Sequence, residues 1–131
     1  MVSSLLILLS INPEHVDNIF RGVKKYEFRK VRSRRPVERI VIYATAPVCR
    51  VVGEAEVEGV VQGSPDDVWT TTKDLSGISK ELFDAYYRGR ESAFAYKLGC
   101  VSRYATPRRL EEIGVSTAPQ SFVYLKACAS D

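Results

Sequence analysis

The sequence predicts an α+β fold in which a small, partly closed mixed β-barrel of about five to six strands is decorated by short helices. Predicted strands outnumber predicted helices, and no predicted helix is longer than about three turns. Their order is strand, helix, three strands, helices and two strands, which differs from the regular alternation of a doubly wound sheet. With 131 residues, of which 45% are hydrophobic, the chain has the size of one globular domain, and we assign residues 1–131 to it.

The first half of the chain predicts four strands and one helix. Asn12 followed by Pro13 is a helix start, and Gly22 predicts where that helix ends. Apolar runs and period-two alternation predict the strands, and the nearly continuous β-branched run at 39–44 indicates a central strand covered on both faces. The four strands are expected at residues 5–11, 25–31, 39–44 and 51–61.

The second half predicts short helices and two further strands. Ser64 and Ser79 are N-caps of two helices, and Gly89 ends the second. Thr106-Pro107 predicts a further one- to two-turn helix that Gly114 closes. The remaining strands are expected at residues 93–104 and 121–129.

Composition excludes several classes of protein. Cys49, Cys100 and Cys128 are odd in number, far apart and form no C-x-x-C pair, which argues against a disulfide framework and against a zinc site. No apolar run approaches the ~18 residues of a membrane span. No P-loop or G-x-G-x-x-G motif occurs. We therefore expect a cytoplasmic protein with no metal, no cofactor and no membrane partner.

Charge is distributed unevenly along the chain. The net charge is only +3, but residues 21–39 contain nine basic and two acidic side chains, whereas residues 54–84 contain eight acidic and two basic ones. A molecule with one basic end is suited to a polyanionic ligand.

One motif stands out in the basic segment. RGVKKYEFRK contains Gly22-x-Lys24-x-x-Glu27-x-Arg29 after a predicted strand and short helix, and this pattern resembles the signature of the ASCH domain, a family of the PUA-like group of small β-barrels. The stretches LLSINPEHVDNIFRG, VIYATAPVCRVVGEAEV and PQSFVYL are similar to the family's opening strand and helix, its central strands and its closing strand. The resemblance spans nearly the whole chain.

The resemblance implies a PUA-like barrel with a cleft near the signature that holds a nucleobase or single-stranded nucleic acid. Family members are thought of mainly as RNA-binding modules, and some are amidohydrolases that deacylate a modified cytidine or are ribonucleases. In the amidohydrolase branch the signature Lys is catalytic, and Thr stands where this chain has Glu27. Lys24 matches that lysine, and Asp74 lies roughly where an acidic partner is expected.

The leading hypothesis is an RNA-binding module whose cleft recognises a nucleobase or modified nucleoside. Arginines bind phosphates bidentately, and a tyrosine such as Tyr26, Tyr43 or Tyr124 can stack on an unpaired base. A solvated basic surface and tyrosines that only pack are the alternatives. The candidate binding residues are Lys24, Lys25, Glu27, Arg29, Arg32, Arg34, Arg35 and Tyr43.

The rival hypothesis is an enzyme acting on RNA or on a modified nucleoside. A lysine becomes a base or nucleophile when burial or nearby cations lower its pKa, whereas a nearby carboxylate favours the charged form. His15, without a second His or a Cys within ligand spacing, is expected to face solvent. The candidate catalytic residues are Lys24, Glu27, Asp74, Tyr43 and Ser121. A surface salt-bridge cluster around the signature, and a regulatory protein that binds a protein partner, remain as alternatives.

Overall fold

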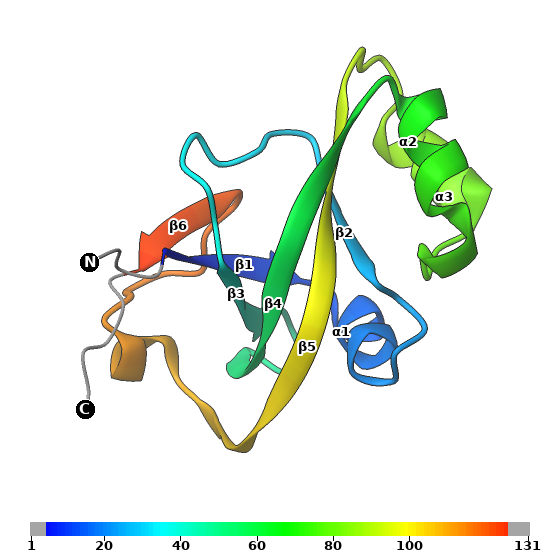
Figure 1. Ribbon diagram of the computed structural model, residues 1–131. Helices are drawn as coiled ribbons and strands as arrows, with labels where there is room; N and C mark the ends of the chain where they lie inside the picture. Colours follow the sequence, from blue (N-terminus) through cyan, green and yellow to red (C-terminus); the bar gives the residue numbers. More distant parts are fainter. Residues whose placement is uncertain (1–4, 126–131) are drawn as a thin grey trace.

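A single curled sheet of six strands forms the body of the molecule (Figure 1). The computed structural model describes residues 5–125, and within them the strand order is β2-β5-β4-β3-β1-β6. The strands are β1 (Leu6–Ile11), β2 (Tyr26–Arg29), β3 (Arg39–Ala44), β4 (Arg50–Gly63), β5 (Ala93–Arg108) and β6 (Phe122–Leu125). The helices are α1 (Pro13–Phe20), α2 (Pro65–Thr72) and α3 (Lys80–Tyr86), with 3-10 turns η1 (Lys73–Leu75) and η2 (Leu110–Ile113). The predicted α+β fold is confirmed.

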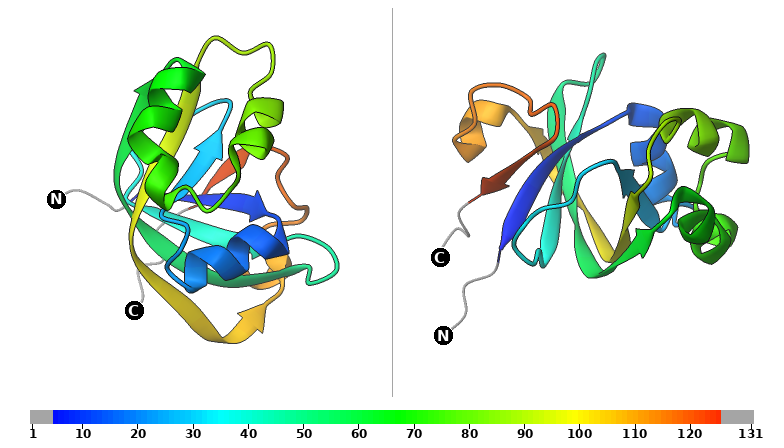
Figure 2. Two further views of the ribbon diagram at one scale, coloured as in Figure 1. Left: turned by 90° about the vertical axis from the view of Figure 1, so that its right-hand side faces the viewer. Right: turned by 90° about the horizontal axis from the view of Figure 1, so that it is seen from above.

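Strand pairing makes the sheet mixed. Strands β1 and β3 run parallel, and every other pair is antiparallel. Strands β4 and β5 are 14 and 16 residues long and run side by side through the whole molecule (Figure 2). Three register shifts interrupt their pairing, and such irregularities increase the local bend of a sheet. The sheet therefore curls into a half-barrel instead of remaining open.

The two faces of the sheet have separate cores. On one face, alternate residues of β1 and β3 pack beneath α1, where Val16 and Ile19 are buried. On the other face, Leu8, Val41 and Tyr43 pack towards the segment around η2. Because successive side chains of a strand point to opposite faces, neighbouring residues of β1 and β3 belong to different cores.

Helix α1 and the turn after it form for local reasons. The Asn12 side chain accepts a hydrogen bond from the Glu14 backbone N–H over 2.8 Å, and Pro13 occupies the first helical position. Gly22 follows the helix with φ +81°, a conformation that glycine adopts without strain. This turn leads the chain directly from α1 into β2.

The segment between β4 and β5 folds as a helical layer at one end of the sheet (Figures 1 and 2). Ser64 and Ser79 cap α2 and α3 as predicted. Phe83 of α3 is buried against Phe28 of β2, with ring centroids 5.3 Å apart, and against Trp69 of α2. These aromatic contacts fix α3 beside β2.

The C-terminal part of the described chain differs in one element from the prediction. The prediction of a helix that begins at Thr106-Pro107 is wrong, because β5 continues to Arg108 and pairs there with Val51. Only one 3-10 turn follows before Gly114, which has φ +78°. The predicted last strand begins at Phe122, and its predicted residues 126–129 lie outside the described range, as does Cys128.

Residues 5–125 contain neither a membrane-spanning helix nor a cluster of metal ligands. No helix among them is long and apolar enough to cross a membrane. They contain no group of three or more His, Cys, Asp or Glu side chains arranged to hold a metal ion. Cys49 and Cys100 are exposed free thiols.

Candidate functional site

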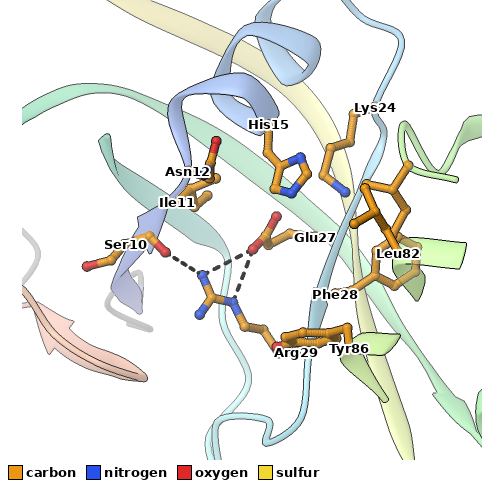
Figure 3. A pocket seen from close by; sticks show the side chains of 11 residues that line it. Ser10, Ile11, Asn12, His15, Lys24, Glu27, Phe28, Arg29, Leu82 and Tyr86 are labelled. Carbon is orange, nitrogen blue, oxygen red and sulfur yellow. Dashed lines mark hydrogen bonds and ion pairs between the residues drawn. The ribbon is translucent and has the colours of Figure 1, made fainter. Parts of the chain in front are cut away.

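A pocket of about 270 Å³ opens where β1, α1, β2 and α3 meet (Figure 3). The end of β1 and the start of α1 form one side, and β2 forms the floor. Ile78 and the exposed face of α3 form the opposite side. Its lining residues are Ser10, Ile11, Asn12, His15, Lys24, Glu27, Phe28, Arg29, Ile78, Leu82 and Tyr86. Three of the four signature residues therefore share one cavity.

Lys24 is buried at the inner end of this pocket, with only 2% of its surface exposed. Its Nζ donates a 3.0 Å hydrogen bond to the backbone carbonyl of Ser76 and lies 4.7 Å from the centre of the Phe28 ring. Burial lowers the pKa of the Lys24 amine; the Glu27 carboxylate opposes this effect, and the Arg29 cation adds to it. Lys24 is thus a desolvated amine with one fixed partner.

Gly77 explains how such a long side chain is packed. Its φ is +69°, and a Cβ built there would overlap the Cβ and Cγ atoms of Lys24. The backbone of the loop after η1 therefore lies directly on the aliphatic stem of Lys24. This contact, together with the Ser76 carbonyl, determines where the ammonium group lies.

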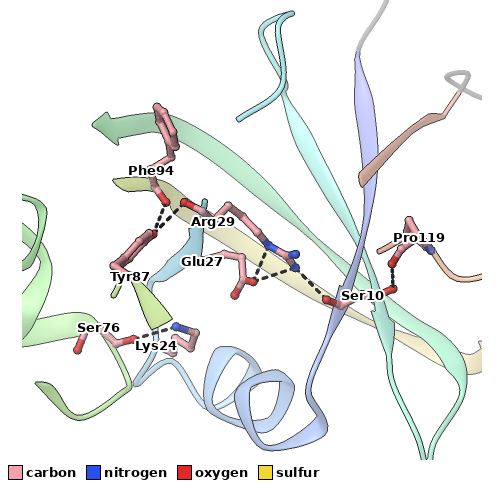
Figure 4. A network of polar contacts seen from close by, with 8 residues as sticks. All are labelled: Ser10, Lys24, Glu27, Arg29, Ser76, Tyr87, Phe94 and Pro119. Carbon is pink, nitrogen blue, oxygen red and sulfur yellow. Dashed lines mark hydrogen bonds and ion pairs between the residues drawn. The ribbon is translucent and has the colours of Figure 1, made fainter. Parts of the chain in front are cut away.

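Glu27 and Arg29 form a buried ion pair on the floor of the pocket (Figure 4). Arg29 Nε and Nη2 each lie 3.1 Å from Oε2 of Glu27, and their side chains are only 14% and 8% exposed. Arg29 Nη2 also donates a 2.8 Å hydrogen bond to the backbone carbonyl of Ser10. The Arg29 guanidinium is therefore engaged by Glu27 and Ser10, and its predicted role in phosphate binding stays a prediction.

The signature brings Lys24 and Glu27 together despite their odd spacing. Alternation along one strand would separate them, but Lys24 precedes β2, which begins at Tyr26. The turn around Gly22 is therefore free to direct Lys24 into the same cavity as Glu27. Lys24 binds the Ser76 carbonyl instead of the Glu27 carboxylate.

His15 is a pocket residue that the sequence did not lead us to expect. It was expected to face solvent, yet it lines the pocket and its Nδ1 atom is buried without a hydrogen-bond partner. Burial and the Lys24 cation lower the pKa of His15, while Glu27 and Glu14 oppose them. Residues four apart lie on the same face of a helix, so the spacing from buried Ile19 is the sequence signal that His15 faces the protein interior.

Helix α3 contributes an apolar wall. Leu82 and Tyr86 lie one turn apart and are 56% and 36% exposed, although both are large hydrophobic residues. Lys30 Nζ lies 4.7 Å from the centre of the Tyr86 ring. Of the three tyrosines proposed for stacking, Tyr26 and Tyr43 are buried and only Tyr124 is exposed.

Several predicted site residues lie elsewhere. Tyr43 does not share the Lys24 cavity; it lines a separate pocket of about 300 Å³ with Cys49, Arg50 and Arg109. Successive side chains of β3 point to opposite faces of the sheet, and Tyr43 points to the face opposite α1. The expected common cleft of Lys24, Glu27 and Tyr43 is therefore wrong. Lys25, Asp74 and Ser121 also lie outside the lining of the Lys24 pocket, and all three are exposed.

The basic loop between β2 and β3 leaves two arginines exposed. The backbone N–H groups of Arg34 and Arg35 donate to the Tyr124 hydroxyl over 3.1 and 3.3 Å. The Arg35 guanidinium lies 5.6 Å from the centre of the same ring. Arg32 is partly exposed and donates to the side chain of Gln62. The loop is thus tied to β4 and β6, with arginines on its surface.

The curled mixed sheet with three short helices is that of a PUA-like α+β barrel. The structure is similar to the crystal structure of ASCH from Zymomonas mobilis, with a TM-score of 0.84 and 32% sequence identity, over 92% of this chain and 87% of that one. The chain belongs to the ASCH domain family.

Two curated relatives show the same similarity at the level of sequence. The ASCH domain-containing ribonuclease of Zymomonas mobilis subsp. mobilis is 37% identical over 93 residues, which are 70% of this chain and 62% of that protein. The large ribosomal subunit protein uL22 of Ureaplasma parvum serovar 3 is 33% identical over 121 residues, 92% of this chain. The chain spans only 39% of the length of that protein. No protein-family profile matches the chain.

Proposed function

We propose that this ASCH domain binds RNA and that the Lys24 pocket holds one unpaired nucleobase or modified nucleoside. The observation that carries the proposal is a small cavity with a charged, hydrogen-bonding side and an apolar side. A volume of about 270 Å³ lies just below the usual range of small-molecule sites, which suits one nucleoside. A relative named as a ribonuclease supports RNA as the polymer.

Each side of the pocket matches one part of an unpaired base. Leu82 and Tyr86 offer an exposed apolar surface for the flat face of the ring. Lys24 offers donors and Glu27 an acceptor for polar atoms on its edge, which single-stranded RNA leaves unpaired. Arg29 holds Glu27 in place, so the acceptor is positioned before any ligand arrives.

The basic loop supplies phosphate contacts in this proposal. Arg32, Arg34 and Arg35 follow β2, whose side chains form the pocket floor. Arg34 and Arg35 are exposed, and guanidinium groups bind phosphate through paired N–H donors. The loop therefore contributes affinity for the polymer, and the pocket contributes recognition of one base.

Binding of a fluorescently labelled single-stranded RNA of about 12 nucleotides with degenerate sequence tests the proposal. Lys24→Met keeps the aliphatic stem but removes the ammonium group, and we expect it to weaken binding by about tenfold or more. Lys73→Met is the matched control, because Lys73 is an exposed lysine that lies outside the pocket lining and outside the candidate binding residues. If the unmodified protein does not bind this RNA, or if both variants bind equally well, the proposal is wrong.

An enzyme acting on RNA or on a modified nucleoside is the second candidate, and the buried amine favours it. A lysine with a lowered pKa is a better base or nucleophile at neutral pH. In this proposal Lys24 takes that role, and Glu27 is the proton shuttle that shares its cavity. Asp74, Tyr43 and Ser121 would take part only if substrate or conformational change brought them closer.

Incubation with total cellular RNA separates binding from turnover. Fragment sizing reports cleavage, and mass spectrometry of nucleosides reports removal of an acyl group. Shorter RNA or loss of an acylated nucleoside with the unmodified protein, and neither with Lys24→Met, would establish an enzyme that depends on this amine. Unchanged RNA with bound protein would leave binding as the function.

A further inference from the structure

Lys30 is an exposed cation that lies against a wall residue of the Lys24 pocket. It directly follows β2, and its Nζ lies 4.7 Å from the centre of the Tyr86 ring. Lys80 and Lys97 each pair with an acidic side chain, whereas no carboxylate within residues 5–125 lies within ion-pair distance of Lys30. An exposed ammonium group without an acidic partner has its charge and its N–H donors available for a ligand.

We propose that Lys30 binds the phosphate of the nucleotide whose base the Lys24 pocket holds. The inference rests on the proposed function, because it takes an RNA base as the occupant of the pocket. It adds a phosphate subsite beside the mouth of the pocket. The pocket and Lys30 together then recognise a nucleotide instead of a base alone.

The burial of the lining residues indicates which part of a nucleotide stays outside. Lys24 lies at the inner end and is only 2% exposed, and Glu27 and Arg29 pair on the floor. Leu82 and Tyr86 are the exposed lining residues of α3, so this side of the pocket meets solvent. Burying a charged phosphate is costly, so the base enters and the phosphate stays on the solvent side. One ribose separates the two, which places the phosphate near the exposed Tyr86 wall.

Tyr87 holds this wall against the strand that leads to Lys30. Its side chain is buried, and its hydroxyl donates hydrogen bonds of 2.9 and 3.2 Å to the backbone carbonyls of Arg29 and Phe94 (Figure 4). The rings of Tyr86 and Tyr87 lie 4.8 Å apart. The end of α3 is therefore fixed beside the end of β2, and the Tyr86 ring and the backbone of Lys30 are close together before a ligand arrives.

Lys30 is also the first residue of the basic loop between β2 and β3. The arginines that the proposed function assigns to phosphate contacts follow within five residues and are Arg32, Arg34 and Arg35. One cation beside the pocket and further cations along the same loop match the successive phosphates of a strand. The RNA strand therefore leaves the pocket past Tyr86 and continues towards this loop.

Two polyanions of equal charge separate this role from general electrostatic attraction. One is the degenerate single-stranded RNA of about 12 nucleotides, and the other is an abasic ribose–phosphate oligomer of the same length, which has no base to enter the pocket. Lys30→Met keeps the aliphatic stem and removes the charge. We expect it to weaken RNA binding by about threefold at low salt and to lower the salt slope by about 0.7. Affinity for the abasic oligomer should fall by less than about 1.5-fold.

Two further variants control for position and charge. Lys30→Arg keeps the charge and should bind RNA within about twofold of the unmodified protein. Lys73→Met removes an exposed lysine outside the pocket lining and should leave both affinities unchanged. Thermal unfolding confirms that each variant is folded.

The possible outcomes distinguish the inference from the proposed function. Equal losses for RNA and the abasic oligomer in Lys30→Met, no loss for RNA, or an Arg variant as weak as the Met variant would overturn the role of Lys30 and leave the base pocket standing. If the unmodified protein binds the RNA no better than the abasic oligomer, the proposed function itself is contradicted.

Discussion

Arg29 of β2 donates a 2.8 Å hydrogen bond to the backbone carbonyl of Ser10 in β1, although three strands separate β2 from β1 in the sheet. The Ser10 carbonyl is available because the pairing of β6 with β1 ends at Leu9. One side chain therefore bridges the gap that the curled sheet leaves open (Figure 4). The same guanidinium holds Glu27, so closure of the half-barrel and placement of the pocket's carboxylate depend on one residue.

We expect Arg29→Lys to destabilise the protein by about 2–3 kcal/mol, because one ammonium group cannot reproduce the forked contacts and Glu27 stays buried. Urea unfolding measures the change. Arg32→Lys is the control, since Arg32 makes a hydrogen bond to Gln62 on the protein surface and should change stability by less than about 0.5 kcal/mol. Equal effects of the two substitutions would contradict the bridging role.

Gly77 offers a test of how Lys24 is held. Gly77→Ala adds a Cβ that overlaps the stem of Lys24 at a backbone φ of +69°, and we expect a loss of about 2–4 kcal/mol. Gly89→Ala is the matched control, because Gly89 has φ +78° but open space around it, so only the strain of about 1 kcal/mol remains. Thermal or urea unfolding of both variants checks the difference.

If the two glycine substitutions cost the same, the loop after η1 does not press on Lys24 as the structure shows. A second readout is RNA affinity. Gly77→Ala should weaken binding because it shifts Lys24, whereas Gly89→Ala should not. Loss of stability with unchanged affinity would mean that the amine keeps its position by another route.

Local signals in the sequence predicted most of the elements, whereas tertiary geometry decided the site. The cap formed by Asn12 and Pro13 acts within one helical turn, so α1 could be located from the sequence. The end of β5 could not, because Arg108 stays extended through pairing with Val51, which lies far away in sequence. Cross-strand pairing there overrides the local helix signal of Thr106-Pro107.

The part of the site that depends on local sequence was predicted, and the part that depends on tertiary geometry was not. Lys24, Glu27 and Arg29 are close in sequence, and their shared pocket follows from one turn and one short strand. Tyr43 was misplaced, because which face of β3 lies beside β2 depends on how the sheet curls, whereas the helical spacing of His15 from Ile19 did indicate its facing. No pattern in a single sequence specifies that curl.

The buried amine predicts a pH dependence of stability. In the fold, burial lowers the pKa of Lys24 below its ordinary value of 10.5, so over the interval between the two values the unfolded chain binds more protons. Stability therefore rises with pH across that interval. Below the interval, both states are protonated and the desolvation cost is present in full. The stability of the unmodified protein relative to Lys24→Met should therefore increase as the pH rises towards 10.5.

Urea unfolding at several pH values measures this difference, and titrations shared by both proteins cancel from it. Lys25→Met serves as the matched control at an exposed site. A difference for Lys24→Met that stays constant or falls with rising pH would show that the amine is not desolvated in solution.

Tyr86 should be the stacking residue of the pocket. Replacing it by Ala removes an aromatic surface, and stacking of one base contributes about 1–3 kcal/mol. We therefore expect Tyr86→Ala to weaken RNA binding by roughly 5- to 140-fold. Tyr86→Phe keeps the ring and should bind within about twofold of the unmodified protein. Fluorescence anisotropy checks both, and comparable loss in the two variants would assign the effect to the hydroxyl instead of the ring face.

The exposed arginines of the loop between β2 and β3 should bind phosphate groups of the RNA. Each phosphate contact on a single strand contributes about 0.7 to the slope of log affinity against log salt, because counterions are released. Replacing Arg34 and Arg35 by Gln should therefore lower the slope by about 1.4 and reduce affinity at low salt. Arg88→Gln, at an exposed position after α3, is the control and should leave the slope unchanged. A slope that is the same in all these proteins would place the phosphate contacts outside this loop, even if the pocket still binds a base.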